Sequence, residues 1–181
     1  MEHIVRKAFW DHEKEEQWLN EMAAKGWALT GYSWCKYVFE ETPKNEYVYR
    51  IEFLDNLPAH PESGEYIAFL EENGIEHVAS YTRWIYLRKK AAEGEFELYT
   101  DIGSKIKHYE KINTFWTTLA LAEFAVCLVE IVIGLNQSGR LFILNLVLSC
   151  MLAIMGILLL GLGIRIRKKI RRLHQEKAIR E

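Results

Sequence analysis

The sequence lacks the short motifs that mark most enzymes and metal proteins. Its three cysteines share no CxxC spacing and are too few for a disulfide framework. Its six histidines are scattered, without the HxxxH or HExxH spacing of a metal site. No GxSxG, Walker or Rossmann motif is present. These absences predict a protein that is not an enzyme and has no metal or other cofactor.

The start of the chain also lacks the apolar segment of a secretory signal. The first six residues, MEHIVR, contain no apolar core, so no cleaved signal peptide is expected. A signal for membrane insertion would therefore have to lie further along the chain.

Two long apolar runs are present, at residues 114–134 and 141–164, separated by a short polar stretch at 135–140. Each run exceeds the roughly 20 residues with which a helix crosses about 30 Å of hydrocarbon. A helix of a soluble protein normally keeps one polar side. The sequence therefore predicts a hairpin of two transmembrane helices, with both chain ends on the same side of the membrane.

The charges beside these runs predict which side that is. The basic tail, residues 165–181, holds eight Lys and Arg against two Glu, whereas the connector carries only Arg140. Lys and Arg beside a span are retained in the cytoplasm, so both termini are expected there. Anionic lipids of the inner leaflet attract such cations. The cations expected at that surface are Arg165, Arg167, Lys168, Lys169, Arg171 and Arg172.

The part before the first span is acidic. Residues 1–112 hold 14 Lys and Arg against 21 Asp and Glu, a net charge of −7. Unaided binding to nucleic acid needs positive charge against phosphate, so nucleic acid is not an expected partner. The expected partners are inner-leaflet lipids, together with further copies of the chain or another membrane protein.

Periodicity predicts six elements in this acidic part. Asp11 is a good N-cap and Gly26 a good C-terminal stop for the first helix. The expected elements are strand 3–10, helix 12–25, strand 27–40, strand 46–54, helix 61–73 and strand 75–89. This order predicts an α+β, ferredoxin-like βαββαβ domain over residues 1–100. Both helices would cover one face of a four-stranded antiparallel sheet, with the first and third strands in its centre. A helix capped by Asp101 or Ser104 would follow over residues 101–113 and run unbroken into the first span.

Several stretches of the acidic part resemble a known family. They are residues 15–23, 25–27, 49–55, 66–72 and 81–84. They resemble the bacterial family of domains of unknown function numbered twenty-eight twelve. The resemblance implies a head domain followed by a membrane segment, in genes that often neighbour a PadR-type transcription regulator. It implies a regulatory role at the inner membrane face and supplies no catalytic residues.

Polar residues inside the two spans are the first candidate site. Glu123 and Glu130 are costly in a span and usually face a protein interior or a water-filled path. In a folded hairpin, Glu130 would lie level with Asn145 and accept a hydrogen bond from it, and Glu123 would lie near Ser149. Such residues pack helices together, within the hairpin or between copies. Ion or proton coupling is the alternative.

The second candidate site lies on the sheet face that the predicted fold leaves open. Arg6, Arg50, Glu52 and Arg83 would converge there if the strands paired as expected. Arginines can bind a carboxylate or phosphate of a ligand or partner. A solvated network of ion pairs is the alternative.

These patterns together favour a non-enzymatic membrane protein whose head senses a ligand or binds a partner at the inner face. The intramembrane carboxylates support a second hypothesis, an accessory or oligomeric subunit of a transporter. An enzyme ranks third, because no set of nucleophile and base is recognisable.

Overall fold

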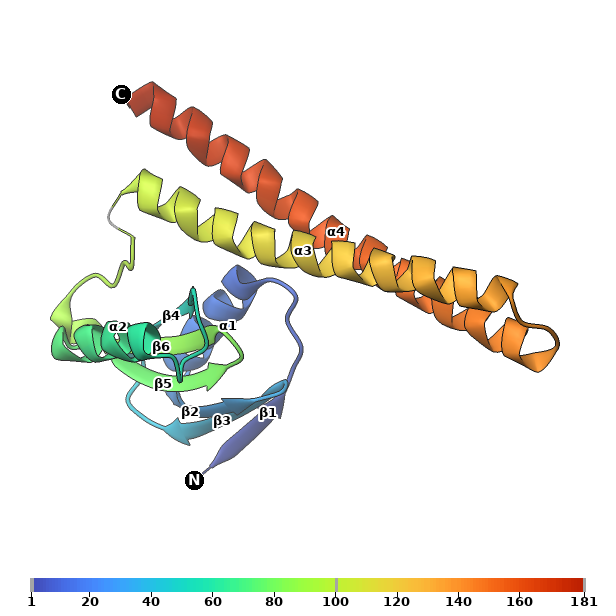
Figure 1. Cartoon of the computed structure of the whole chain (residues 1–181). Coiled ribbons are helices and arrows are strands. Elements are labelled where there is room, and N and C mark those ends of the chain that lie inside the picture. The colour runs from blue at the N-terminus through green and yellow to red at the C-terminus, as the bar shows by residue number, and fades with distance from the viewer. Residues whose placement is uncertain (1, 100, 181) are drawn as a thin grey trace. The chain divides into compact units, whose positions relative to one another are not determined.

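A computed structural model of the chain describes residues 2–99 and 101–180, and it divides into two compact units (Figure 1). The head unit, Met1–Leu98, combines helices with antiparallel strands, and the helical unit, Tyr99–Glu181, contains two long helices. The predicted α+β class is therefore confirmed.

The described residues of the head unit, 2–98, form six strands, where the sequence predicted four. Its elements are β1 (His3–Arg6), α1 (His12–Ala24), β2 (Trp27–Ser33), β3 (Lys36–Glu41), β4 (Tyr47–Phe53), α2 (Pro61–Glu72), β5 (Glu76–Tyr81), β6 (Trp84–Lys90) and the short 3-10 turn η1 (Ala91–Glu93). Both predicted helices form within two residues of their expected ends. The Asp11 side chain accepts a hydrogen bond from the backbone N–H of Glu13, as an N-cap does.

The two additional strands arise because the predicted strands 27–40 and 75–89 are each a hairpin. The first hairpin turns at Trp34 and Cys35, which have φ of 31° and 58°, and the second turns at Thr82, with φ of 54°. Left-handed backbone of this kind usually belongs to Gly, Asn or Asp. Neither turn has Gly, Asn or Asp at its left-handed positions, so the sequence gives no signal for these two turns.

The strands pair in two three-stranded antiparallel sheets, in the orders β1-β3-β2 and β4-β6-β5. The predicted four-stranded ferredoxin-like sheet was wrong. The strands expected in its centre, β1 and β4, are edge strands, and β3 and β6 are central. Each sheet is therefore built entirely from the strands of one half of the head unit.

The head unit is a tandem repeat of one βαββ motif. β2 carries a bulge between Leu29 and Gly31, and β5 carries one between His77 and Ala79, 48 residues further along. The partner residues on β3 and β6 differ by the same 48 positions. Gly26 and Gly74, also 48 residues apart, each lie just after a helix and each have a positive φ. The second half of the head therefore repeats the backbone path of the first.

Helix α1 shields the free edge of β4. The Asn20 side chain accepts a hydrogen bond from the Tyr49 N–H (2.8 Å) and donates one to the Tyr49 carbonyl oxygen (3.2 Å). Two residues further along β4, the Ile51 N–H donates a hydrogen bond to the Glu16 carboxylate (3.0 Å). The side chains of α1 thus satisfy backbone groups that an edge strand leaves open.

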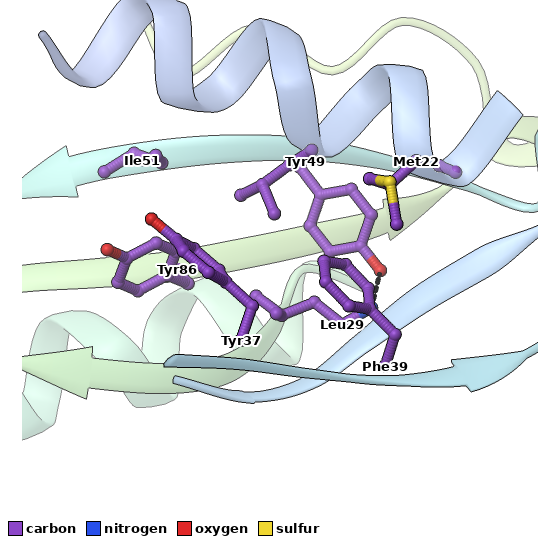
Figure 2. Packing of buried hydrophobic residues seen from close by; sticks show 9 residues of the cluster. Met22, Leu29, Tyr37, Phe39, Tyr49, Ile51 and Tyr86 are labelled. Atoms are coloured by element: carbon purple, nitrogen blue, oxygen red, sulfur yellow. Dashed lines mark hydrogen bonds between the residues drawn. The ribbon is translucent and has the colours of Figure 1, made fainter. Parts of the chain in front are cut away.

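The main hydrophobic core joins the two repeats (Figure 2). Both sheets and α1 contribute to it: Leu19, Met22, Ala23, Leu29, Tyr37, Phe39, Tyr49, Ile51 and Tyr86. The Tyr49 hydroxyl accepts a hydrogen bond from the Leu29 N–H (2.8 Å), which links β4 to β2 inside this core (Figure 2). A second cluster forms between sheet β4-β6-β5 and α2.

The helical unit consists of α3 (Ile102–Leu135) and α4 (Arg140–Arg180). Asp101 caps α3 by accepting a hydrogen bond from the Ser104 N–H (2.8 Å). The prediction that one helix runs from this cap through the first apolar run is confirmed. Both helices are long and apolar enough to cross a membrane, and Figure 1 shows them folded into a hairpin.

Small residues at every seventh position form a seam along which α3 and α4 approach each other closely. They are Ala120, Cys127 and Gly134 on α3, and Ser149, Gly156 and Gly163 on α4, and all are buried. The Cys127 thiol donates to the Ser149 carbonyl oxygen (3.3 Å). A Cβ atom added to Gly156 would lie 3.0 Å from the Phe124 ring. Close approach through small residues is how membrane helices pack.

Candidate functional site

The structure does not bring the four predicted head residues together on an open face. Arg6 is exposed on β1, in one sheet, whereas Arg50 and Glu52 lie on β4, in the other. Arg83 lies in the β5–β6 turn, where its Nε donates to the Leu54 carbonyl oxygen (2.8 Å). Arg50 forms an ion pair with Glu16 (3.3 Å).

The β4 face that carries Arg50 and Glu52 is covered. Leu70 of α2 forms a buried cluster with Leu54, which directly follows β4, with Ile85 and Leu87 of β6, and with Phe96 from the segment that follows η1. The Arg50 guanidinium lies 5.7 Å from the centre of the Phe96 ring. These contacts give Arg50 a packing role beside its ion pair.

The two carboxylates of the apolar part of α3, Glu123 and Glu130, are half-buried beside the α3–α4 seam. The expected hydrogen bond from Asn145 to Glu130 is not formed, because the Asn145 amide donates to Gln137 (3.1 Å). The Ser149 hydroxyl donates to the Asn145 carbonyl oxygen (2.8 Å). Within residues 2–99 and 101–180, neither carboxylate makes a hydrogen bond or an ion pair inside the helical unit.

The cations of the basic tail are mostly exposed along α4. Arg165, Lys168, Arg171 and Arg172 are exposed, and the Lys169 ammonium lies 4.6 Å from the centre of the Tyr109 ring of α3. The Arg167 guanidinium donates to the Thr117 hydroxyl (3.4 Å). The tail thus continues the second helix as a basic segment.

A buried polar cluster in the head unit was missed by the sequence analysis. Glu15 of α1 is only 8% exposed. Its Oε1 atom accepts hydrogen bonds from the hydroxyls of Tyr37 on β3 and Tyr86 on β6, both at 2.6 Å. The cluster thus connects α1 to the central strands of both sheets. One signal was available: Glu15 precedes Leu19 and Met22 by four and seven residues, on the buried stripe of the helix.

Further aromatic rings extend this cluster towards solvent. The Tyr32 ring lies 4.7 Å from those of Tyr37 and Tyr86, centre to centre. The Tyr81 ring lies 5.7 Å from Tyr32, and that of Trp34 lies 6.0 Å from Tyr81. Trp34 is 76% exposed. A series of rings therefore leads from the surface to the buried carboxyl group.

Burial dominates the electrostatics of the cluster. Desolvation raises the pKa of Glu15 above its usual range, although the hydrogen bonds from Tyr37 and Tyr86 act in the opposite direction. Desolvation also raises the pKa of Tyr32, Tyr37 and Tyr86, so these hydroxyls keep their protons at neutral pH. In the described part of the chain, no Lys, Arg or His lies within ion-pair distance of Glu15.

The raised pKa of Glu15 predicts a pH-dependent stability. In the unfolded chain Glu15 ionises near 4.5, whereas in the folded head it keeps its proton to higher pH. The free energy of unfolding should therefore fall by about 1.4 kcal/mol for each pH unit between about 4.5 and the pKa of the folded head. Denaturant unfolding of the full-length chain in a non-ionic detergent, at a series of pH values, measures this. The difference from Glu15→Gln isolates the contribution of Glu15, and a difference that is flat with pH would contradict the assignment.

The comparison with protein families matches most of the head unit and the first part of α3. A model described as Protein of unknown function (DUF2812) matches residues 11–121. The chain belongs to this family. The resemblance noted from the sequence, to the family numbered twenty-eight twelve, is thereby confirmed. No curated protein and no solved structure matches the chain. The DUF2812 match includes Glu15, Tyr32, Tyr37 and Tyr86, whereas Glu123 and Glu130 lie beyond its end.

Proposed function

We propose that this DUF2812 protein is a non-enzymatic, two-span integral membrane protein whose head unit binds a ligand or a protein partner at the inner membrane face. The observation that carries the proposal is the α3–α4 hairpin. Each helix contains an apolar stretch long enough to cross a bilayer, and small residues close the seam between the two.

The distribution of charge supports the inner face. The turn between α3 and α4 lies beside a single cation, Arg140, whereas residues 165–181 carry eight Lys and Arg. Cations that flank spans are retained in the cytoplasm. The two ends of the hairpin that lead to the head unit and to the basic tail would therefore both be cytoplasmic.

A binding role for the head is supported by its buried Glu15 cluster. A carboxyl group taken out of water costs free energy unless it is paired. Burial raises the pKa of Glu15, and residues whose pKa is perturbed by burial and specific partners are enriched at functional sites. The Glu15 cluster is therefore the feature of the head that supports a binding role.

Transport is the weaker hypothesis. It is motivated by Glu123 and Glu130, which are costly inside a span. Small residues close the seam between α3 and α4, so one hairpin encloses no conduit. A transport pathway would therefore require further copies or another subunit.

Cysteine labelling tests the proposed arrangement. In a chain whose native cysteines are replaced by serine or alanine, Ser138→Cys at the hairpin turn should react with an impermeant maleimide on intact cells. Gln175→Cys in the tail should react only after the cells are opened. Both positions are exposed, so access to the reagent decides the result. Labelling of Gln175→Cys on intact cells, with Ser138→Cys spared, would reverse the topology and remove the proposed inner-face role.

A further inference from the structure

We propose that the free edge of β1 docks a second copy of this chain, whose own β1 pairs with it in antiparallel orientation. The inference rests on the binding role proposed above for the head and names the partner. The docking edge consists of β1 together with Glu2, the residue that precedes it.

β1 is the edge strand that the described part of the head unit leaves uncovered. β1 and β2 end one sheet, and β4 and β5 end the other (Figure 1). β2 and β5 lie against each other, and α1 satisfies the edge of β4 through Asn20 and Glu16. On β1, Ile4 is 51% exposed. An uncovered edge is a template for pairing with a strand of another chain.

The register of β1 shows which of its backbone groups point outward. The Lys7 N–H donates to the Cys35 carbonyl oxygen (2.9 Å), towards β3. Backbone groups of successive residues point to opposite sides of a strand. Val5 therefore also faces β3, whereas Ile4 and Arg6 direct their N–H and carbonyl groups away from the sheet.

The repeat explains why a strand suits this edge better than a helix does. Ile4 is the equivalent of Ile51, because the two pair with equivalent residues of β3 and β6. Glu16 of α1 accepts a hydrogen bond from the Ile51 N–H. The equivalent position of α2 is Gly64, which has no side chain to accept one. The α2 helix of a second copy would therefore leave the edge of β1 unsatisfied.

The charges of the docking edge select one register. When Ile4 lies opposite Ile4 of the second copy, Arg6 of each copy lies opposite Glu2 of the other. Opposite charges at directly opposed positions stabilise strand pairing, and like charges oppose it. Within its own sheet Arg6 is paired with Lys36, a like charge. A register that sets Arg6 opposite Ile4 would lose both charge pairs.

Disulfide cross-linking of the full-length chain in isolated membranes tests this pairing. Anchoring in one bilayer raises the effective concentration of the two copies, which favours a short interface. The native cysteines are replaced by serine or alanine, and copper phenanthroline is the oxidant. Hydrogen-bonded opposed residues have Cα atoms about 5.5 Å apart, within the roughly 4.4–6.8 Å that a disulfide spans. We therefore expect Ile4→Cys to form a covalent dimer.

A matched cysteine and a charge reversal control the result. Ser33→Cys is exposed on β2, two strands away from the docking edge, and should not cross-link. In the Ile4→Cys chain, either Arg6→Glu or Glu2→Arg creates two like-charge pairs and should slow cross-linking by about fourfold or more. Combining Arg6→Glu with Glu2→Arg recreates both opposite-charge pairs and should restore the rate.

The proposal is overturned if Ile4→Cys forms no dimer, if Ser33→Cys cross-links as fast, or if the combined charge reversal stays slow. A covalent product of Ile4→Cys with a different protein also overturns it, because the edge then serves another partner. The labelling of Ser138→Cys and Gln175→Cys reports the membrane arrangement independently. Failed cross-linking beside the expected labelling would therefore reject the second copy and leave the membrane anchor standing.

Discussion

Replacing Gly156 by leucine is expected to open the α3–α4 hairpin. A Cβ atom at this position would already lie 3.0 Å from the Phe124 ring, so a leucine side chain has no room between the helices. Overpacking of this kind typically costs about 1–3 kcal/mol. Because 1.4 kcal/mol is a factor of ten in an equilibrium, the open form should become about 5- to 140-fold more populated.

The thiol of Cys127 gives the measurement, because it is buried in the same seam. With Cys35 and Cys150 replaced, the rate of its modification by N-ethylmaleimide in detergent should rise by a similar factor in Gly156→Leu. Gly161 lies on the same helix with nothing within 4 Å of an added Cβ atom. Gly161→Leu adds the same apolar bulk and should leave the rate unchanged. Equal rates in the two variants would show that the seam does not hold the helices together.

Replacing Asn20 by leucine is expected to destabilise the head unit by about 2–4 kcal/mol. The Asn20 amide satisfies both the N–H and the carbonyl oxygen of Tyr49 on the edge of β4. Leucine would leave both groups without partners beside an apolar side chain. An unsatisfied buried group costs about 1–3 kcal/mol, and two are affected at a partly buried position.

Denaturant unfolding of the full-length chain, followed by tryptophan fluorescence, measures this loss. Gln17→Leu makes the same type of change at an exposed position of α1 and should alter the free energy of unfolding by less than about 0.5 kcal/mol. If Asn20→Leu is no more destabilising than Gln17→Leu, α1 does not stabilise the β4 edge through this side chain.

The elements with local chemical signals were predictable. Asp11 and Gly26 mark the ends of α1, and Asp101 marks the start of α3. The two apolar runs exceed the length of ordinary core helices, so their helical form followed from composition alone. In each case the deciding residues lie within a few positions of the feature that they determine.

The strand arrangement was not predictable in this way. The turns at Trp34-Cys35 and at Thr82 carry left-handed backbone without Gly, Asn or Asp, so the sequence pattern predicts each hairpin as one continuous strand. The repeat was hidden because equivalent positions differ chemically. Glu16 and Asn20 bind the β4 edge, whereas the residues 48 positions on are Gly64 and Ala68.

The predicted site on the open sheet face was wrong, and the Glu15 cluster was missed, for a related reason. Strand alternation placed Arg50 and Glu52 on one face of β4, which is correct, but it could not show that α2 packs on that face. Glu15 meets Tyr37 and Tyr86 across separations of 22 and 71 residues. Local periodicity carries no information on such contacts, which depend on how the two sheets assemble.

Because the two βαββ repeats of the head unit belong to one chain, their association does not depend on protein concentration. The main core takes Leu29, Tyr37 and Phe39 from the first unit, and Tyr49, Ile51 and Tyr86 from the second. A single unit of this size buries a small fraction of its surface and would need a partner copy. Covalent linkage supplies that partner at an effective concentration in the millimolar range. It also allows the two halves to diverge, so that α1 provides Glu15 and Asn20 for contacts with the sheets, whereas the equivalent positions of α2 are Ser63 and Ala68.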